Sequence, residues 1–146
     1  MSIVFEGANV ASGQAVVVTN YERICKIIDR PSKMLGDYIQ HKLISISRNK
    51  SFNLSYGRDS LTKETIISAY AFNTTLDELN SILPQFIEDL VTCRSCRKLD
   101  TYLCWDVGCT ATVICVNCNF LSQTDLGDDL KYKVSPTINT LAGTIC

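Results

Sequence analysis

The chain has 146 residues, of which 46% are hydrophobic and 20% are charged, so it is long enough to fold as one ordinary domain or two very small ones. No apolar run approaches the roughly 20 residues that span a bilayer, and the N-terminus lacks the features of a signal peptide. We therefore expect a cytoplasmic protein with no membrane partner. The formal net charge of −1 excludes a global attraction to nucleic acid, so any RNA contact requires a local basic patch.

The first residues predict an arm, a strand and two helices. Residues 1–14 predict a flexible arm, and the β-branched run at residues 15–18 predicts a short strand. A helix is predicted next, and Pro31 ends it because the residue before a proline disfavours helical dihedrals. Its apolar face consists of Tyr21, Ile24, Cys25 and Ile28. Ser32 can cap a second helix that runs to Leu43, and the pair fits either a helix-turn-helix or two helices that pack a small core.

The middle of the chain predicts strands. Alternating residues predict strands at 44–47 and 52–56, and a glycine indicates a turn at 57–59. An apolar run at 66–72 predicts another strand. Residues 62–64 fit either the connection between strands or the start of a short helix.

A third helix leads towards the C-terminal third. Thr75 and Glu78 match a capping box, in which each side chain satisfies a free backbone N–H of the first turn. The amphipathic helix that follows is expected to kink at Pro84, which lacks a backbone donor, and to end close to Cys93. Two later strands are predicted at 120–122 and 130–134, followed by a short polar tail.

Eight cysteines in a chain expected to be cytoplasmic favour metal binding over disulfides. Two Cys-x2-Cys pairs, separated by 18 residues, have the spacing of a four-cysteine zinc site, with Cys93, Cys96, Cys115 and Cys118 as ligands. Such a site is structural, because protein sulfurs fill all four positions and leave no bound water to activate. Asn119 follows the second pair, and asparagine tolerates the positive φ that such a loop can require.

Two further cysteines lie between these pairs. We interpret Cys104 as a small apolar residue and Cys109 as a loop residue. The alternatives are a second metal or an exchange of ligands.

Nothing in the sequence indicates an enzyme. The single histidine, His41, falls in the second predicted helix, so no catalytic dyad with a cysteine is evident from the chain. Neither a Gly-x4-Gly-Lys-Ser/Thr loop nor a Gly-x-Gly-x-x-Gly loop is present. We interpret the carboxylates Asp125, Asp128 and Asp129 as a solvated loop.

Basic residues accompany the cysteines. Three follow the first ligand closely, and two lie two positions apart on a later predicted strand, hence on one face; they are Arg94, Arg97, Lys98, Lys131 and Lys133. They could form a patch that contacts RNA phosphates. Ordinary solvent-exposed cations explain them equally well.

Several of these segments together resemble one family, the domain shared by translation initiation factor 5 and the beta subunit of translation initiation factor 2. The matching segments are Asp29-Arg30-Pro31, residues 86–93, residues 94–101 and Cys115-Val116-Asn117-Cys118, and the resemblance covers about residues 14–134. It implies a role in start-codon selection, with initiator tRNA, small ribosomal subunit RNA and the GTP-binding initiation factor 2 as partners. It also implies that the zinc ribbon performs no chemistry of its own.

The sequence departs from this family in two places. Leu99 stands where the family usually has proline. No Lys or Arg precedes Arg23, whereas factor 5 carries a basic N-terminal arm with an arginine proposed to stimulate GTP hydrolysis.

These observations predict an α+β chain, in which a small mixed α/β core domain precedes a four-cysteine zinc ribbon. The expected boundaries are an arm at 1–14, the core domain with its connecting helix at 15–91, the ribbon at 92–135 and a tail at 136–146. Two alternative functions stay open. One is a transcription-type zinc ribbon that binds nucleic acid, and the other is a structural or assembly protein that reuses the fold.

Overall fold

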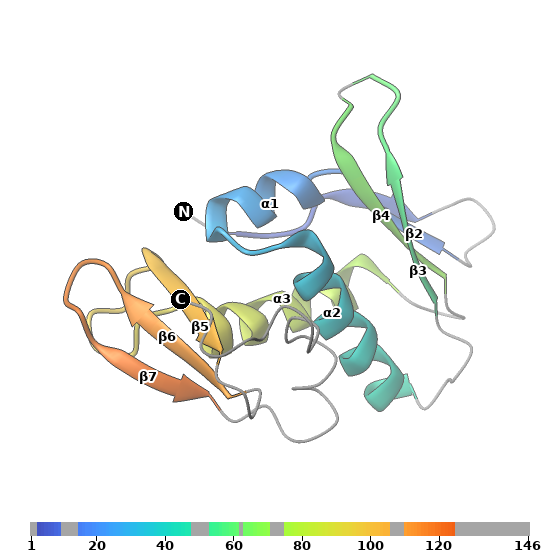
Figure 1. Cartoon of the computed structure of the whole chain (residues 1–146). Helices are drawn as coiled ribbons and strands as arrows, with labels where there is room; N and C mark the ends of the chain where they lie inside the picture. The colour runs from blue at the N-terminus through green and yellow to red at the C-terminus, as the bar shows by residue number, and fades with distance from the viewer. Residues whose placement is uncertain are drawn as a thin grey trace. The chain divides into compact units, whose positions relative to one another are not determined.

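The computed structural model describes residues 3–9, 15–47, 53–61, 63–70, 75–105 and 110–124 (Figure 1). Within these residues it contains three helices and two antiparallel sheets, which confirms the predicted α+β class. The chain divides into two compact units, residues 1–84 and 85–146, and each is described by itself. No helix in the described ranges is both long and apolar enough to cross a membrane.

The first unit is built on a four-stranded sheet. Its strands are β1 (Gly7–Asn9), β2 (Ala15–Val18), β3 (Asn53–Arg58) and β4 (Thr65–Tyr70), and they pair in the order β1-β2-β4-β3. Ile67 of β4 lies opposite Val18 on one side and Tyr56 on the other. Residues directly opposite in a sheet share a face, so this row marks the side of the sheet that packs against the helices. Val16, Val18 and Ile67 are fully buried there.

Part of the segment expected to be a flexible arm is ordered. Residues 7–9 form β1, which pairs with β2. The preceding residues are held by two asparagines. Asn20 accepts the Glu6 N–H through Oδ1 at 2.7 Å, and Asn80 accepts the Phe5 N–H through Oδ1 at 2.6 Å and donates to the Phe5 carbonyl at 3.2 Å. Side-chain amides can replace a neighbouring strand in this way because they carry both a donor and an acceptor.

Helix α1 (Tyr21–Ile28) buries the four apolar residues predicted to form its inner face. The helix ends at Asp29, whose φ of 54° is left-handed, and the N–H groups of Asp29 and Arg30 return to carbonyls of the last turn. The Arg30 guanidinium also donates to the Ile28 and Asp29 carbonyls. Burial lowers the pKa of Arg30 to about 10. The Asp-Arg-Pro segment therefore closes α1 by hydrogen bonding as well as by the proline.

Helix α2 (Ser32–Ser47) is longer than predicted. The prediction of a strand at residues 44–47 is wrong, because these residues form the last turn of α2. Leu43 is buried four residues after Ile39, and the Ser45 hydroxyl donates to the His41 carbonyl one turn earlier. An apolar alternation only four residues long fits a helix as well as a strand, and the preceding helical turns decide between them.

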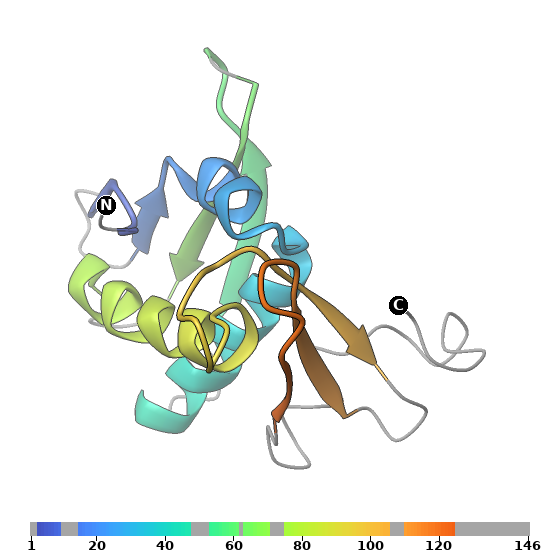
Figure 2. The ribbon, with the colours of Figure 1, turned by 90° about the vertical axis from the view of Figure 1, so that its left-hand side faces the viewer.

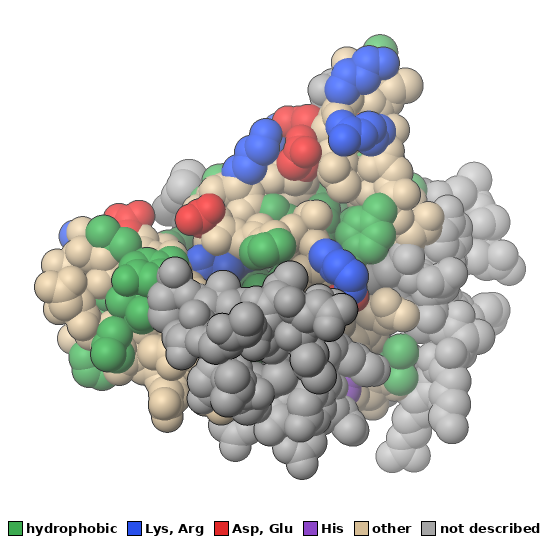
Figure 3. Space-filling view, viewed as in Figure 1, with side chains coloured by type: hydrophobic (Ala, Val, Ile, Leu, Met, Phe, Trp, Pro, Cys, Tyr) green, Lys and Arg blue, Asp and Glu red, His purple; other side chains and the backbone are tan. Residues whose placement is uncertain are grey.

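The connection between β3 and β4 also differs from the prediction. The strand β3 continues to Arg58, so the turn follows residue 58. The Asp59 N–H donates to the Glu64 carbonyl at 2.9 Å, and Lys63 has a positive φ of 62°. Residues 63 and 64 are not helical, and Thr62 lies outside the described residues. Basic side chains are visible on this hairpin in Figure 3.

A close approach joins α2 to β3. Gly36 lies in the second turn of α2, and glycine normally destabilises the interior of a helix. A Cβ at this position would lie 1.8 Å from the hydroxyl oxygen of Tyr56 and 2.9 Å from its Cζ. The missing side chain therefore makes room for the Tyr56 ring, which meets Tyr21 edge to face with centroids 6.4 Å apart.

Helix α3 (Leu76–Leu90) begins as predicted. The Glu78 N–H donates to the Thr75 hydroxyl at 3.2 Å, which is one half of the capping box. The helix continues through Pro84, which is the last residue of the first unit. The kink predicted at Pro84 stays a prediction. Its apolar stripe is buried at Leu79, Ile82, Leu83, Phe86 and Leu90.

The second unit contains a three-stranded sheet, in the order β5-β6-β7 (Figure 2). Its strands are β5 (Thr101–Trp105), β6 (Ala111–Cys115) and β7 (Leu121–Thr124). Trp105, Ala111 and Val113 are buried on one face. The predicted strand at 120–122 corresponds to β7, whereas the strand at 130–134 and the tail at 136–146 lie outside the described residues. The predicted domain boundaries stay predictions.

Candidate metal centre

Helix α3 ends shortly before the first candidate ligand, Cys93. The N–H groups of Val91 and Thr92 both donate to the Ile87 carbonyl, at 3.0 and 2.8 Å, and the Thr92 hydroxyl donates to the same oxygen. The Thr101 hydroxyl donates to the Val91 carbonyl. The Val-Thr-Cys sequence therefore terminates the helix and fixes the position of Cys93, because the helix-end carbonyls find partners in the segment that follows.

Two loops with the same backbone hydrogen bonds carry the four cysteines. We call residues 93–98 the first knuckle and residues 115–120 the second knuckle. In each, the residue after the second cysteine donates its N–H to the carbonyl of the first cysteine, at 2.9 Å from Arg97 and 3.1 Å from Asn119. These two residues have positive φ values of 64° and 62°. The positive φ expected at Asn119 is confirmed, and Arg97 adopts the same conformation.

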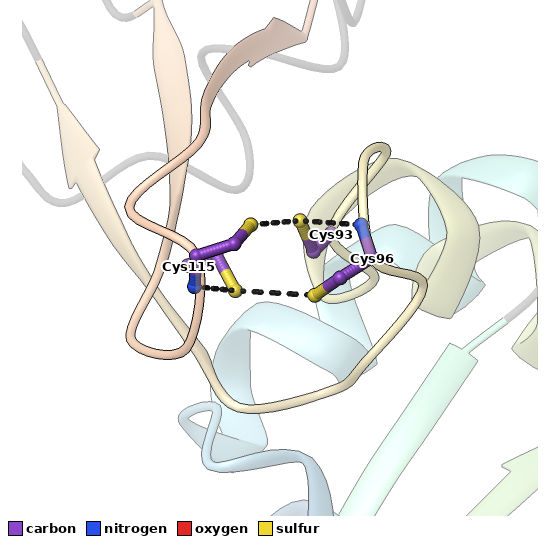
Figure 4. Close-up of side chains that lie close together, drawn as sticks. Cys93, Cys96 and Cys115 are labelled. Atoms are coloured by element: carbon purple, nitrogen blue, oxygen red, sulfur yellow. Dashed lines mark hydrogen bonds between the residues drawn. The ribbon is translucent and has the colours of Figure 1, made fainter.

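The four sulfurs converge on one point (Figure 4). All lie within 4.8 Å of one another, with Sγ–Sγ distances of 3.5 Å from Cys93 to Cys118 and from Cys96 to Cys115. None of the four is in a disulfide. A tetrahedral ion bound at about 2.3 Å separates its sulfur ligands by about 3.8 Å, so the spacing fits a metal held by four thiolates. The structure thus brings together the four residues that the sequence singled out.

Backbone N–H groups point at the sulfurs and prepare them to ionise. Hydrogen bonds from the Cys96 and Ser95 N–H groups, each at 3.4 Å, lower the pKa of Cys93 to about 6. The Cys118 N–H lowers the pKa of Cys115 in the same way. For Cys96, the N–H of Lys98 lowers the pKa, but burial and the neighbouring thiols raise it further, to about 11. Four thiolates this close repel one another, and a bound cation removes that repulsion.

The donor set limits what the centre can do. Four protein sulfurs complete a tetrahedron, so no coordination position is left for water or substrate. Soft thiolate ligands favour zinc, copper(I) or iron over magnesium or calcium. The centre can therefore cross-link the two knuckles, and its binding energy contributes to folding of the second unit.

The remaining cysteines have other environments. Cys25 is a buried free thiol in α1, and burial raises its pKa to about 11. Cys104 is buried in β5 but is disulfide-bonded, which the expectation of a small apolar residue did not include. The other described cysteines are free thiols, and Cys109 lies outside the described residues.

Only part of the predicted basic patch can be placed. Arg97 binds Glu88 through two hydrogen bonds, at 2.9 and 2.6 Å, and this fork lowers the pKa of the Glu88 carboxyl. Arg94 and Lys98 are exposed on the first knuckle. Lys131 and Lys133 lie outside the described residues.

Sequence reasoning missed two contacts that support the centre. Glu88 lies nine residues before its partner Arg97, and no local pattern links a helix residue to a knuckle. Asn117 donates to the Asp100 carboxylate at 3.2 Å, and the Val116 N–H donates to the Asp100 carbonyl at 2.9 Å. These bonds attach the second knuckle to the start of β5. The acidic residues Asp125, Asp128 and Asp129 lie outside the described residues.

A family model described as the domain found in initiation factors 2B and 5 matches residues 3–121, which is most of the chain and includes all four cysteines. This match confirms the resemblance found in the sequence. No curated protein matches the chain.

Proposed function

Because the chain belongs to the translation initiation factor family that carries this shared domain, we propose that it acts in start-codon selection. Its partners in this role are the initiator tRNA, small ribosomal subunit RNA and the GTP-binding initiation factor 2. The observation that supports the proposal most directly is the family match over residues 3–121, which spans both the α/β core and the four-cysteine centre.

The metal we propose is a single Zn²⁺ bound by Cys93, Cys96, Cys115 and Cys118. Zinc requires neither redox chemistry nor an open coordination position, and four thiolates satisfy it completely. The ion fixes the two knuckles relative to each other, so they can present a defined surface to a partner. The protein acts by binding and not by catalysis, in the cytoplasm, where initiation takes place.

The first knuckle is the RNA contact we propose within the described residues. Arg94 and Lys98 are exposed on this knuckle, and neither forms a direct ion pair with a described residue. Cations of this kind gain most from contact with phosphates, because binding releases counterions from the RNA. Lys131 and Lys133, which fall in the predicted ribbon at 92–135, extend this proposal to the following segment.

Co-sedimentation with purified small ribosomal subunits tests the proposal. The zinc-loaded chain is expected to bind in a salt-sensitive manner, alone and with initiator tRNA. The double variant R94E/K98E should lose most of this binding, whereas K33E, which reverses an exposed charge on α2, should keep it.

Three outcomes would redirect the proposal. Unchanged binding by R94E/K98E would show that the first knuckle is not the contact surface. Recovery from cell extract with RNA polymerase instead of ribosomes would indicate a transcription factor. Self-association without RNA binding at low salt would indicate an assembly protein.

A further inference from the structure

The ribbon sheet carries an exposed apolar row. Tyr102 lies opposite Ile114, which in turn lies opposite Leu121, so the three side chains cross all strands of the sheet on one face. Tyr102 is 44% exposed and Leu121 is 60% exposed. Figure 3 shows hydrophobic side chains gathered over this part of the molecule. Contiguous exposed apolar side chains are a feature of surfaces that bind ligands or partners.

The two knuckles share one backbone conformation but present opposite chemistry. The first exposes three cations beside Ser95, whereas the second has no charged residue and exposes Val116, at 65%, and Phe120, at 44%, beside two asparagines. Phe120 leads directly into Leu121 of β7 and thus into the apolar row. The backbone of the second knuckle does not require an aromatic residue here, because the Cys115 N–H donates to the Phe120 carbonyl, which any residue would provide.

The cations of the first knuckle divide into two kinds. Arg97 is fixed by the fork to Glu88, so its charge is already paired within the second unit. Arg94 and Lys98 have no such partner among the described residues. The sulfurs of the two knuckles lie within 4.8 Å of one another, so the loops that carry Arg94 and Lys98 and the loop that carries Phe120 meet at one centre.

We propose that this surface binds unpaired nucleotides of RNA, with Phe120 and Tyr102 stacking on bases and Arg94 and Lys98 contacting phosphates. The inference rests on the proposed function and assigns a ligand class to the ribbon. Single-stranded RNA requires this combination, because its bases offer flat apolar faces while its backbone carries one negative charge per nucleotide. A purely apolar protein partner would leave the two free cations without a role. Arg97 is a positioning residue that holds the knuckle to α3 and does not contact RNA.

The test uses the full zinc-loaded chain and a fluorescent single-stranded RNA of about ten nucleotides, the length that one small binding module covers. A strand of the same length that lacks the bases but keeps every phosphate serves as the paired probe. The variant F120A should weaken RNA binding by about 10-fold, as expected for the loss of one stacked base, and leave binding of the abasic strand unchanged. F120L should behave like F120A, because leucine keeps the apolar contact but has no aromatic face.

The phosphate contacts are tested by the salt dependence. R94Q/K98Q should weaken binding of both strands and reduce the slope of log affinity against log salt by about 1.4, since each contact to a single strand contributes roughly 0.7. R97Q is the matched control on the same knuckle and should change this slope little. Metal content and circular dichroism confirm that each variant is folded.

Two results would overturn the inference. Equal affinity for the abasic strand and the RNA would show that bases are not read, and wild-type RNA affinity of F120L would show an apolar contact without stacking. If the chain still co-sediments with small subunits in either case, the inference falls while the proposed function stands. If the chain binds neither subunits nor RNA, both fall.

Discussion

The replacement of Gly36 by alanine should destabilise the first unit, although the change favours a helix. Alanine in a helix interior is better than glycine by about 1 kcal/mol. Its Cβ, however, would lie 1.8 Å from the Tyr56 hydroxyl oxygen, and ordinary contact begins at 3.4 Å. The ring must therefore move by about 1.6 Å, and the paired backbone of β3 and β4 restricts that movement to the side chain.

The cost of moving the ring can be worked from its surroundings. Tyr56 is 43% exposed, so it buries about 100 Å² of the 150–250 Å² that a fully buried aromatic residue covers. Loss of half of this area costs about 1.3 kcal/mol, and loss of the edge contact with Tyr21 costs about 1 kcal/mol more. After the gain in helix propensity, G36A should reduce the free energy of unfolding by about 1 kcal/mol.

A double-mutant cycle makes this prediction specific. In a Y56A background the obstructing ring is gone, so G36A should increase stability by about 1 kcal/mol. The sign of the effect thus reverses, with a coupling energy of about 2 kcal/mol between the two positions. Urea unfolding of the zinc-loaded chains, followed by circular dichroism, measures all four proteins. Stabilisation by G36A in the wild-type background would refute the proposed close packing of α2 on β3.

Three further predictions concern the N-terminal segment and the thiols. N80A removes both hydrogen bonds to the N-terminal segment and should cost about 1–3 kcal/mol of unfolding free energy, measured by urea denaturation; an unchanged midpoint would mean that the segment is not held there. C115S should abolish metal binding, measured as zinc per chain, and shift the emission of the single, buried Trp105 to longer wavelength, whereas C25S should keep the metal. In the zinc-free chain at a pH of about 7.5, iodoacetamide should modify Cys93 well before Cys25, because burial in α1 raises the pKa of Cys25 to about 11 and keeps it almost entirely a thiol. Mass spectrometry gives the order, and the rate at Cys25 should rise about tenfold for each pH unit up to its pKa of about 11, whereas equal rates at the two cysteines at a pH of about 7.5 would contradict the burial of Cys25.

Local sequence was sufficient for features whose partners are only a few residues apart. The buried face of α1 follows from apolar spacing, and the start of α3 follows from the hydroxyl of Thr75. The four cysteines were found from the spacing of two pairs, although the pairs themselves are distant. Such a pattern is informative because coordination chemistry allows few arrangements of thiolates around one ion.

Prediction from local sequence failed where a short segment could adopt either of two secondary structures. Residues 44–47 alternate like a strand, but the turns of α2 before them extend the helix through Ser47. Residues 7–9 contain no strong strand former and still pair with β2. In both cases the neighbouring structure supplies the hydrogen bonds, and a short segment adopts whatever conformation satisfies its backbone.

The sequence by itself identified the four cysteines that cluster, the family and the order of most elements, because these depend on residue type and short spacing. Only the tertiary structure decided which cation of the first knuckle is held directly, since Arg97 forms a two-bond fork with Glu88 whereas Arg94 forms no direct ion pair with a described residue. It also revealed the hydrogen bonds between the Asn80 side chain and the Phe5 backbone, which lie 75 positions apart in the chain. Contacts of this kind depend on how distant segments pack against each other, and that packing is the sum of many weak interactions that no single motif encodes.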